Sequence, residues 1–292
     1  MLKAIVTGAA GFAGAHLTRA LAQRGFAVYA IVRPGSLHNR RLSVLESVKQ
    51  IECDLNDLHL LPEKIGEPCD CFFHLAWTGE ANAFAAQYAN VNISLVALKV
   101  AAELSCKRFV ATGSQAEYGL QTELITEDTL PAPFTPYGAA KMATMHLTKS
   151  LAAELGVEWI WGRIFSLYGE FEPHGRMLPD LVSALRAGKD FALTAATQNW
   201  DYLLANEAAD ALIALMERGR DGEVYNIAHG AYRPLKTFTE EMRNYFAPES
   251  NISYGKSNAL AVSLQPSVAK IQRDTGWQAQ ISFMDGIRRT YG

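Results

Sequence analysis

The sequence predicts an α/β fold, a doubly wound parallel sheet joined to a smaller C-terminal α+β lobe. Short apolar runs alternate with helical patterns through the first half of the 292-residue chain, which is typical of strands linked by helices. The runs are apolar almost throughout, as in strands whose two faces are both covered. The expected strands are 2–7, 26–32, 48–54, 70–76, 107–113 and 157–164, and the clearest expected helices between them are 12–24, 81–104 and 136–155.

The regular alternation of strand and helix patterns ends at about residue 165. The stretch SLYGEFEPHGRMLP (166–179) is rich in turn residues and is expected to be a loop. Helical patterns follow at 178–187, 204–217, 235–246 and 266–274, with short apolar runs such as EVYNIA (223–228) between them. We therefore divide the chain into a sheet domain over 1–165, to which part of 200–228 returns, and a lobe mainly over 166–292. A functional cleft is expected at the seam.

Composition and charge exclude several classes of protein. The net charge of -3 gives no electrostatic basis for binding nucleic acid or an anionic membrane. No apolar run is long enough to span a membrane, and the start MLKAIVTGAAG does not resemble a signal peptide. The spacing of the four cysteines suits neither a metal site nor a disulfide scaffold. We expect reduced thiols in a cytoplasmic protein without a bound metal.

The first strand runs into the turn TGAAGFAG, in which Gly8, Gly11 and Gly14 recur every third residue. Gly8 would allow a tight turn, Gly11 a close approach of backbone to a pyrophosphate, and Gly14 close packing of helix on strand. The phosphates would lie at the N-terminus of the following helix, beside Phe12 and Ala13. The alternative is a purely structural turn. The motif predicts that the sheet domain is a Rossmann-like domain that binds a dinucleotide and that the lobe binds the substrate.

The second expected strand indicates which dinucleotide is bound. An acidic residue about twenty positions after the glycines usually binds the ribose hydroxyls of NAD, but Val32 stands there and Arg33 follows. An arginine can pair with the 2′-phosphate of NADP, and Ser36 and Arg40 could assist it. The alternative is an arginine that faces solvent. The sequence therefore favours NADP, with NAD possible.

Tyr137 and Lys141 lie four residues apart in YGAAK and would share one face of a helix. A nearby ammonium is expected to lower the pKa of the phenol and to make it a usable acid or base. Ser114 ends the fifth expected strand, at the sheet edge where ligands bind in open α/β folds. Taken alone, the tyrosine and lysine would be ordinary surface neighbours. Together with Ser114 and the glycine turn, they predict a catalytic site.

These motifs resemble the extended branch of the short-chain dehydrogenase/reductase superfamily, and the resemblance extends over nearly the whole chain. It implies that Ser114, Tyr137 and Lys141 are the catalytic triad. FFHLAW (72–77) looks like the family's fourth-strand segment that lines the cofactor, and WGRIFSLYGE (161–170) looks like its crossing to the substrate lobe. The further residues that this resemblance suggests for the cofactor are Asp54, Leu55, Leu75, Ala76, Trp77, Asn92 and Ile164.

Two of these assignments have structural alternatives. Asp54 could accept a hydrogen bond from the adenine amino group or could cap a helix, although Asn56 or Asp57 would suit the cap better. Trp77 could border the sugar or could be packing. On the substrate side, the sequence suggests Thr78, Gln115, Ser166, Arg176 and Arg233. Asn199 and Ser166 replace an arginine and an asparagine that are common in relatives, so nucleotide recognition is expected to be altered.

Within this family the sequence favours one reaction. A 4,6-dehydratase carries an Asp-Glu pair directly after the catalytic serine or threonine, whereas this chain has Gln115 and Ala116, with Glu117 one place out of register. The resemblance implies NADPH-dependent reduction of the 4-keto group of a nucleotide-linked deoxysugar. The alternatives are an NAD-dependent nucleotide-sugar 4-epimerase and a non-catalytic NADP-binding sensor. Relatives often dimerise through the helices expected at 81–104 and 136–155, so a homodimer is expected here.

Overall fold

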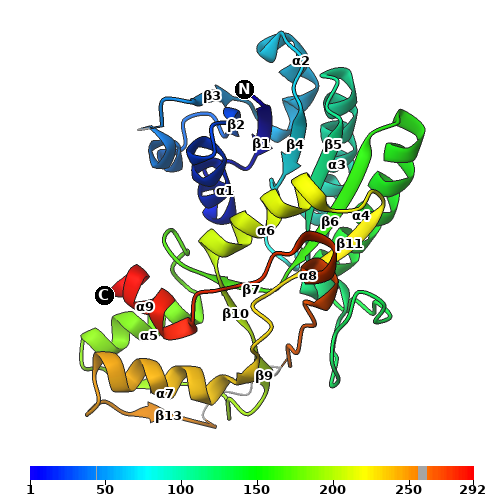
Figure 1. Ribbon diagram of the computed structural model, residues 1–292. Helices are drawn as coiled ribbons and strands as arrows, with labels where there is room; N and C mark the ends of the chain where they lie inside the picture. The colour runs from blue at the N-terminus through cyan, green and yellow to red at the C-terminus, as the bar shows by residue number, and fades with distance from the viewer. Residues whose placement is uncertain (44, 256–261) are drawn as a thin grey trace.

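A seven-stranded parallel sheet forms the centre of the computed structural model, which describes residues 1–43, 45–255 and 262–292 (Figure 1). The strand order is β11-β6-β5-β4-β1-β2-β3, and neighbouring strands are parallel. The strands are β1 (Lys3–Thr7), β2 (Ala27–Val32), β3 (Val48–Glu52), β4 (Cys71–His74), β5 (Arg108–Ser114), β6 (Glu158–Ile164) and β11 (Glu223–Ile227). This sheet confirms the predicted fold class.

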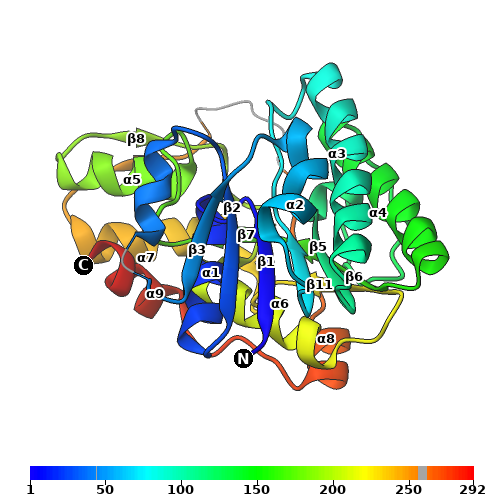
Figure 2. The same ribbon diagram turned by 90° about the horizontal axis from the view of Figure 1, so that it is seen from above.

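Helices cover both faces of the sheet because both faces of its strands are apolar. On one face, α1 (Phe12–Gln23) and α6 (Ala205–Arg218) pack over side chains such as Val6 and Phe73. On the other face, α3 (Phe84–Glu103) and α4 (Pro136–Leu155) lie side by side over Ile5 and Phe72 (Figure 2). Consecutive strand residues thus point to opposite layers. The shorter elements η1 (Leu37–Leu42), η2 (Leu55–Leu60) and α2 (Leu61–Ile65) follow β2 and β3.

The strand order reverses between β1 and β4. The chain runs from β1 outward to β2 and β3, then returns to place β4 on the other side of β1. In open α/β sheets, such a reversal opens a crevice at the carboxyl ends of the two strands, where ligands bind. Here the glycine turn after β1 and the segment after β4 border that crevice, and β5 ends one strand away at Ser114.

The C-terminal lobe has its own apolar core between three helices, α5 (Met177–Arg186), α7 (Leu235–Phe246) and α9 (Phe283–Tyr291). Small two-stranded sheets complete it: β7 (Ser166–Tyr168) with β10 (Tyr202–Leu204), β8 (Phe191–Ala192) with β13 (Ile252–Ser253), and β9 (Asn199–Trp200) with β12 (Arg233–Pro234). The helix α8 (Ala269–Thr275) packs back on α6 and β11. In the described residues, no helix has both the length and the apolar character needed to cross a bilayer.

Candidate active site

The glycine turn closes tightly against the neighbouring strand. Gly8 has a φ of 69°, which favours glycine, and a Cβ there would lie 2.9 Å from the backbone nitrogen of Ala76. A Cβ on Gly14 would lie 2.0 Å from the carbonyl oxygen of Gly8, so the first turn of α1 can approach the strand only because both residues are glycine. Gly11 is the N-cap of α1 and donates its backbone N–H to Gly8.

This cradle fits a pyrophosphate in its shape and its polarity. The turn presents the backbone N–H groups at the N-terminus of α1, with Phe12 and Ala13 in its first helical residues. Helix N-termini of this kind favour anions because the N–H groups lack intrahelical partners. No acidic side chain lies in the first turn of α1 to compete with an anion.

The other wall of the crevice is fixed by a buried network. The Thr7 hydroxyl lies 2.8 Å from Nδ1 of His74, and Nε2 of the same ring lies 3.0 Å from the Ser94 hydroxyl. Burial lowers the pKa of His74 to about 3, so this imidazole is neutral. The Thr7 hydroxyl also accepts the backbone N–H of Ala76, which holds Leu75 and Ala76 beside Gly8. Leu75 and Ala76, which the sequence suggests for the cofactor, thus lie beside the glycine turn.

Tyr137 lies in the first turn of α4, where the sequence places it by its helix-start signals. Thr135 caps the helix by accepting the backbone N–H of Gly138, and Pro136 occupies the first helical position. The backbone N–H of Tyr137 donates to the carbonyl of Ala81 at 3.1 Å. These contacts fix the start of α4 against the segment that follows β4.

Ser114 ends β5 and faces the same place. Its side chain is buried, and its hydroxyl accepts the backbone N–H of Ala116 at 3.2 Å, which caps the short helix η3 (Gln115–Glu117). The Ser114 side chain also faces the Tyr137 phenol closely enough to act on its pKa, in the direction that favours the phenolate. The structure thus brings together the serine and tyrosine that the sequence singled out.

Lys141 is one helical turn beyond Tyr137 and is almost completely buried. Its Nζ donates to the carbonyl of Thr112 at 2.7 Å and lies 3.6 Å from the centre of the Trp77 ring. Burial lowers the pKa of Lys141 to about 7, against the opposing charge of Glu117. A lysine whose pKa is so depressed, beside a tyrosine and a serine at the sheet edge, is a candidate for proton chemistry.

One electrostatic expectation is wrong. We expected Lys141 to lower the pKa of Tyr137, but the pKa of this phenol is raised. Burial is the largest cause, and the Ser114 interaction only partly opposes it. The physical reason is the direction of the ammonium, which binds the Thr112 carbonyl and the Trp77 face and lies 5.9 Å from the centre of the Tyr137 ring. Tyr137 is therefore protonated near neutral pH, which suits a proton donor.

Trp77 is built into the site. Its ring meets that of Tyr137 edge-on at 5.9 Å, and its indole N–H donates to Gln87 at 2.8 Å. Thr78 follows it, and both backbone groups of Thr78 bond the buried side chain of Asn90. The sequence left open whether Trp77 borders a ligand or packs, and the structure places its face directly on Lys141.

The predicted asparagine is displaced by two positions. Asn92 is exposed on α3, whereas Asn90 is fully buried and ties α3 to the segment after β4 through Thr78. Residues two apart on a helix point to nearly opposite sides, so both cannot face the site. The position expected of Asn92 is taken by Asn90.

The adenine side of the crevice carries exposed polar groups. Asp54 caps η2 through the backbone N–H of Asn56, so the expectation that Asn56 or Asp57 would be the cap is wrong. Asp54 is nevertheless exposed at the end of β3, beside the half-buried Leu55. Arg33 is exposed at the end of β2, next to the buried Val32.

A second arginine on this side was missed from the sequence. We named Arg40, but Arg40 is exposed, and its neighbour Arg41 turns inward from η1. Nη1 of Arg41 donates to the carbonyl of Ala10 in the glycine turn at 3.0 Å. Ser36, also named, accepts the backbone N–H of His38 and caps η1. Neighbouring residues of a 3-10 helix point in different directions, so only one of the two arginines faces inward. The composition of the segment does not indicate which one.

On the lobe side, the structure separates the two predicted arginines. Arg176 is exposed at the N-cap of α5. Burial raises the pKa of both Tyr137 and Tyr202, and the Arg176 charge only partly opposes that rise. Arg233 instead makes a double hydrogen-bonded ion pair with Glu241. Gln115, Ile164 and Ser166 are half-buried at the ends of β5 and β6 and the start of β7.

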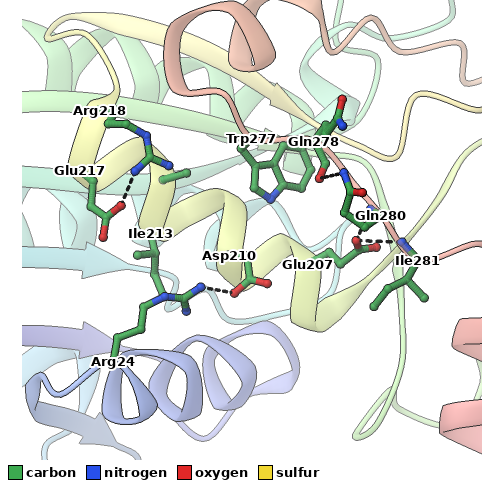
Figure 3. A pocket seen from close by; sticks show the side chains of 11 residues that line it. Arg24, Glu207, Asp210, Ile213, Glu217, Arg218, Trp277, Gln278, Gln280 and Ile281 are labelled. Carbon is green, nitrogen blue, oxygen red and sulfur yellow. Dashed lines mark hydrogen bonds and ion pairs between the residues drawn. The ribbon is translucent and has the colours of Figure 1, made fainter.

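A separate pocket of about 320 Å³ lies away from these groups, between α1, α6 and the segment 277–281 (Figure 3). Its charged side chains pair locally: Arg24 with Asp210, Arg218 with Glu217, and Glu207 with backbone N–H groups of that segment. None of the predicted site residues lines it. The candidate site is therefore the crevice at the carboxyl edge of the sheet.

Comparison with known proteins shows the family to which the chain belongs. Residues 4–228 match the model of a family described as the NAD dependent epimerase/dehydratase family. The chain belongs to this family. The match begins in β1, includes the glycine turn and the Ser114, Tyr137 and Lys141 positions, and ends just after β11.

Named relatives align with this chain over nearly its whole length. A dTDP-D-glucose 4,6-dehydratase of Homo sapiens is 22% identical over 312 residues, covering 99% of this chain and 88% of its own. A dTDP-glucose 4,6-dehydratase of Haemophilus influenzae is 26% identical over 331 residues, covering 99% and 97%. The fold matches the crystal structure of a UDP-glucuronic acid 4-epimerase from Bacillus cereus in complex with NAD, with a TM-score of 0.87, 22% identity and coverage of 99% and 97%.

The candidate site also contains a buried carboxylate, that of Glu117, whose role was not predicted from the sequence. Glu117 is completely buried, forms a 2.7 Å ion pair with Arg163, and accepts the backbone N–H of Ser114. Trp161 donates its indole N–H to the same carboxylate. The sequence signal was an acid next to Tyr118, one place out of register with a dehydratase pair. The structure shows that this carboxylate points into the domain, behind Ser114.

Proposed function

We propose that the protein uses NADPH to reduce the 4-keto group of a nucleotide-linked deoxysugar. One observation carries this proposal. Tyr137 is held protonated beside Ser114, while the two positions after Ser114, Gln115 and Ala116, carry no carboxylate. A site with a proton donor and no acid-base pair for eliminating water suits reduction of a carbonyl.

The residues divide the work as follows. The nicotinamide cofactor, when bound, supplies a hydride to the carbonyl carbon of the sugar. Tyr137 donates its phenolic proton to the alkoxide oxygen that forms, and the Ser114 hydroxyl hydrogen-bonds that same oxygen. Lys141 would hold the nicotinamide ribose, as the resemblance implies. The product is the alcohol, and the phenolate of Tyr137 regains its proton from solvent.

The preference for NADPH is supported by the charge on the adenine side. Val32 stands where an acid would bind the ribose hydroxyls, and its side chain is buried. Arg33 is exposed next to it, and Arg41 places a second guanidinium on the glycine turn. Two arginines near the end of β2 suit a phosphate dianion better than a ribose diol. The nearest acid, Glu52 on β3, accepts the backbone N–H of Gly35 at 3.2 Å.

Dehydration is disfavoured although dehydratases are among the relatives. Elimination of water needs a second proton donor and a base next to the catalytic hydroxyl. Glutamine and alanine supply neither, and Glu117 is committed to its ion pair with Arg163 behind the strand. The proposal therefore separates this chain from the dehydratases within its family.

On the substrate side, we assign Arg176 to the diphosphate. It is exposed at the N-cap of α5, and its charge partly opposes the rise that burial causes in the pKa of Tyr137 and Tyr202, which supports a position near the seam between the sheet domain and the lobe. Arg233 is less suitable because Glu241 neutralises it through two hydrogen bonds. A single exposed guanidinium would contribute a charge-assisted contact to the diphosphate.

A second candidate is an NAD-dependent nucleotide-sugar 4-epimerase. The observation that favours it is the match over the whole chain to an epimerase structure that contains NAD. An epimerase would oxidise and re-reduce the same carbon and would consume no free cofactor.

Stopped-flow absorbance at the NADPH band distinguishes the two functions. The purified protein is mixed with NADPH and either a dTDP-linked or a UDP-linked 4-keto-6-deoxyhexose. Loss of NADPH in proportion to substrate, with the 4-hydroxy sugar as product, is the expected result. If no 4-keto sugar oxidises NADPH, while a nucleotide hexose is interconverted with its 4-epimer by protein that retains NAD, the epimerase is the correct assignment.

A further inference from the structure

Glu117 connects the catalytic serine to a buried ion pair. One carboxylate oxygen accepts the backbone N–H of Ser114 at 2.8 Å and the indole N–H of Trp161 at 3.0 Å. The other accepts Nε of Arg163 at 2.7 Å. In turn, the Ser114 side chain caps η3, the single helical turn that carries Glu117. The position of the Ser114 backbone is therefore set by this carboxylate.

Gly113 leaves room for the Glu117 carboxylate because it has no side chain. A Cβ on Gly113 would lie 2.4 Å from the Glu117 carboxylate and 2.1 Å from the Trp161 indole nitrogen. Glycine at the penultimate position of β5 thus lets the carboxylate pass beneath the strand. Arg163 is held in turn by the face of Tyr118 at 4.4 Å and by the Met145 sulfur.

The charge of Glu117 reaches the reacting groups. Burial lowers the pKa of Lys141 and raises that of Tyr137. The Glu117 charge opposes the first shift and adds to the second, because a nearby negative charge favours the ammonium and opposes the phenolate. Among the residues that the structure describes, three other charged or titratable groups lie around this pair. They are the neutral imidazole of His74 from β4, Arg163 from β6, which is paired with Glu117, and Arg176 from the lobe.

We propose that Glu117 is a positioning residue of the active site: it fixes the backbone of Ser114 and holds a buried negative charge behind Tyr137 and Lys141. Burial is the main reason that Tyr137 stays protonated, and the Glu117 charge adds to it. At Lys141, burial favours the neutral amine, and the same charge opposes that effect. This inference rests on the proposed function in treating Tyr137 as the proton donor. The expected pH shift on removing the charge, however, has the same direction for reduction and for epimerisation.

The direction of the expected shift in the pH–rate profile follows from the pKa changes of Tyr137 and Lys141. Removing the Glu117 charge lowers the pKa of both Tyr137 and Lys141. In reduction, the protonated phenol is needed, so the alkaline limb of the pH–rate profile moves to lower pH. In epimerisation, the first step needs the phenolate, so the acid limb moves to lower pH. Both reactions therefore predict a downward shift of about one pH unit, the low end of the effect of a neighbouring charge.

The experiment compares the wild-type protein with Glu117→Gln, which keeps an oxygen for Ser114 and removes the charge. The first measurement is the pH dependence of kcat/KM. The second is the tyrosinate absorbance titration of each protein minus that of its Tyr137→Phe counterpart. The subtraction isolates Tyr137 from the chain's 11 tyrosines, and it needs no substrate.

Glu207→Gln is the matched control. Glu207 is also buried, and it also accepts backbone N–H groups, but it lies in α6 beside the pocket of Figure 3. It should lower the melting temperature without moving either titration. If Glu117→Gln fails to fold because Arg163 is left unpaired, Glu117→Gln with Arg163→Met removes both buried charges. The pKa of Tyr137 should still fall, because of these two charges only that of Glu117 raises it.

A downward shift in the Tyr137 titration that Glu207→Gln does not reproduce supports the proposal. A folded Glu117→Gln protein, or a folded double variant, whose Tyr137 titrates as in the wild type overturns it and leaves Glu117 a structural residue. Failure of the proposed function is recognised separately, because it shows as absence of NADPH oxidation in the wild-type protein.

Discussion

Lys141 illustrates how an active-site residue lowers the stability of its own fold. Its pKa is about 7 in the folded protein, against an ordinary value of 10.5, because burial disfavours the ammonium. Folding therefore releases a proton between these pH values, and the Lys141 contribution to stability improves as the pH rises from 7 toward 10. Below pH 7 the full cost of burying the ammonium remains.

We predict that Lys141→Met raises the melting temperature at pH 6 and that the difference from the wild type shrinks as the pH approaches 10. The gain should be about 2 °C or more, since 1 kcal/mol shifts a domain of this size by roughly that amount. Differential scanning calorimetry at several pH values measures it. Lys149→Met, on the exposed side of the same helix, should show no such pH dependence. A Lys141→Met protein that melts below the wild type throughout would contradict the prediction.

In the proposed mechanism Tyr137 donates the proton, so its hydroxyl is the atom to test first. Tyr137→Phe should reduce kcat by about 10²–10⁴-fold, the usual contribution of a positioned general acid. NADPH affinity should change little, because the ring and its edge-on contact with Trp77 remain. Fluorescence titration with NADPH and steady-state turnover measure the two effects. Near-normal turnover by Tyr137→Phe would remove Tyr137 from the mechanism.

Arg33 is the residue on which the cofactor assignment depends. Arg33→Ala should raise the KM for NADPH about tenfold or more, because a charge-assisted hydrogen bond contributes roughly 1.5–3 kcal/mol. The KM for NADH should stay unchanged, since NADH lacks the 2′-phosphate. Initial rates with both cofactors give the ratio. Equal loss with the two cofactors would contradict a role in phosphate recognition.

At the scale of elements, the sequence predicted what local patterns control. The glycine turn, the end of β5 and the bounds of α4 follow from residues close together in the chain, and the structure has them where expected. Contacts between distant segments were not predictable in this way. Glu117 pairs with Arg163, which is 46 positions away, and the direction of Lys141 depends on Trp77 and Thr112.

The end of the chain shows the same limit. The sequence FMDGIRRTY forms α9, which the periodicity alone did not identify because the helix is short and carries a glycine. Gly286 is there for a tertiary reason: a Cβ at this position would lie 1.9 Å from the Tyr168 hydroxyl. A helix that depends on such a contact is recognised only when both partners are placed.

Gly138 joins two elements of the site. A Cβ at this position would lie 2.5 Å from the carbonyl oxygen of Ala116, which is backbone and cannot rotate away. Gly138→Ala should therefore push α4 from η3, separate Tyr137 from Ser114, and cost about 1–3 kcal/mol of stability. Thermal unfolding and turnover should fall together. Ala139→Ser, an exposed neighbour on the same turn, should leave both unchanged. A fully active Gly138→Ala protein would show that this contact is not needed.

At the scale of the molecule, α3 and α4 present an exposed apolar face. Its large side chains are Phe84 and Tyr88 on α3, which are 73% and 71% exposed, and Leu147 and Leu155 on α4, which are 48% and 37% exposed. Such side chains gathered on two adjacent helices indicate a protein–protein contact. A second copy of the chain would cover them by packing its own α3 and α4 against this pair, in a symmetric four-helix arrangement.

We therefore predict that the protein is a dimer and that Tyr88→Glu with Leu147→Glu makes it a monomer, because each interface would bury four unpaired carboxylates of the two chains. Size-exclusion chromatography with light scattering gives the mass of each protein. The variant should keep its fold, since both side chains are exposed, and the Ser114, Tyr137 and Lys141 site is complete within one chain. Leu130→Glu, which adds a charge at an 82% exposed leucine outside both helices, should stay dimeric. A wild-type protein with the mass of a single chain would contradict the α3–α4 interface.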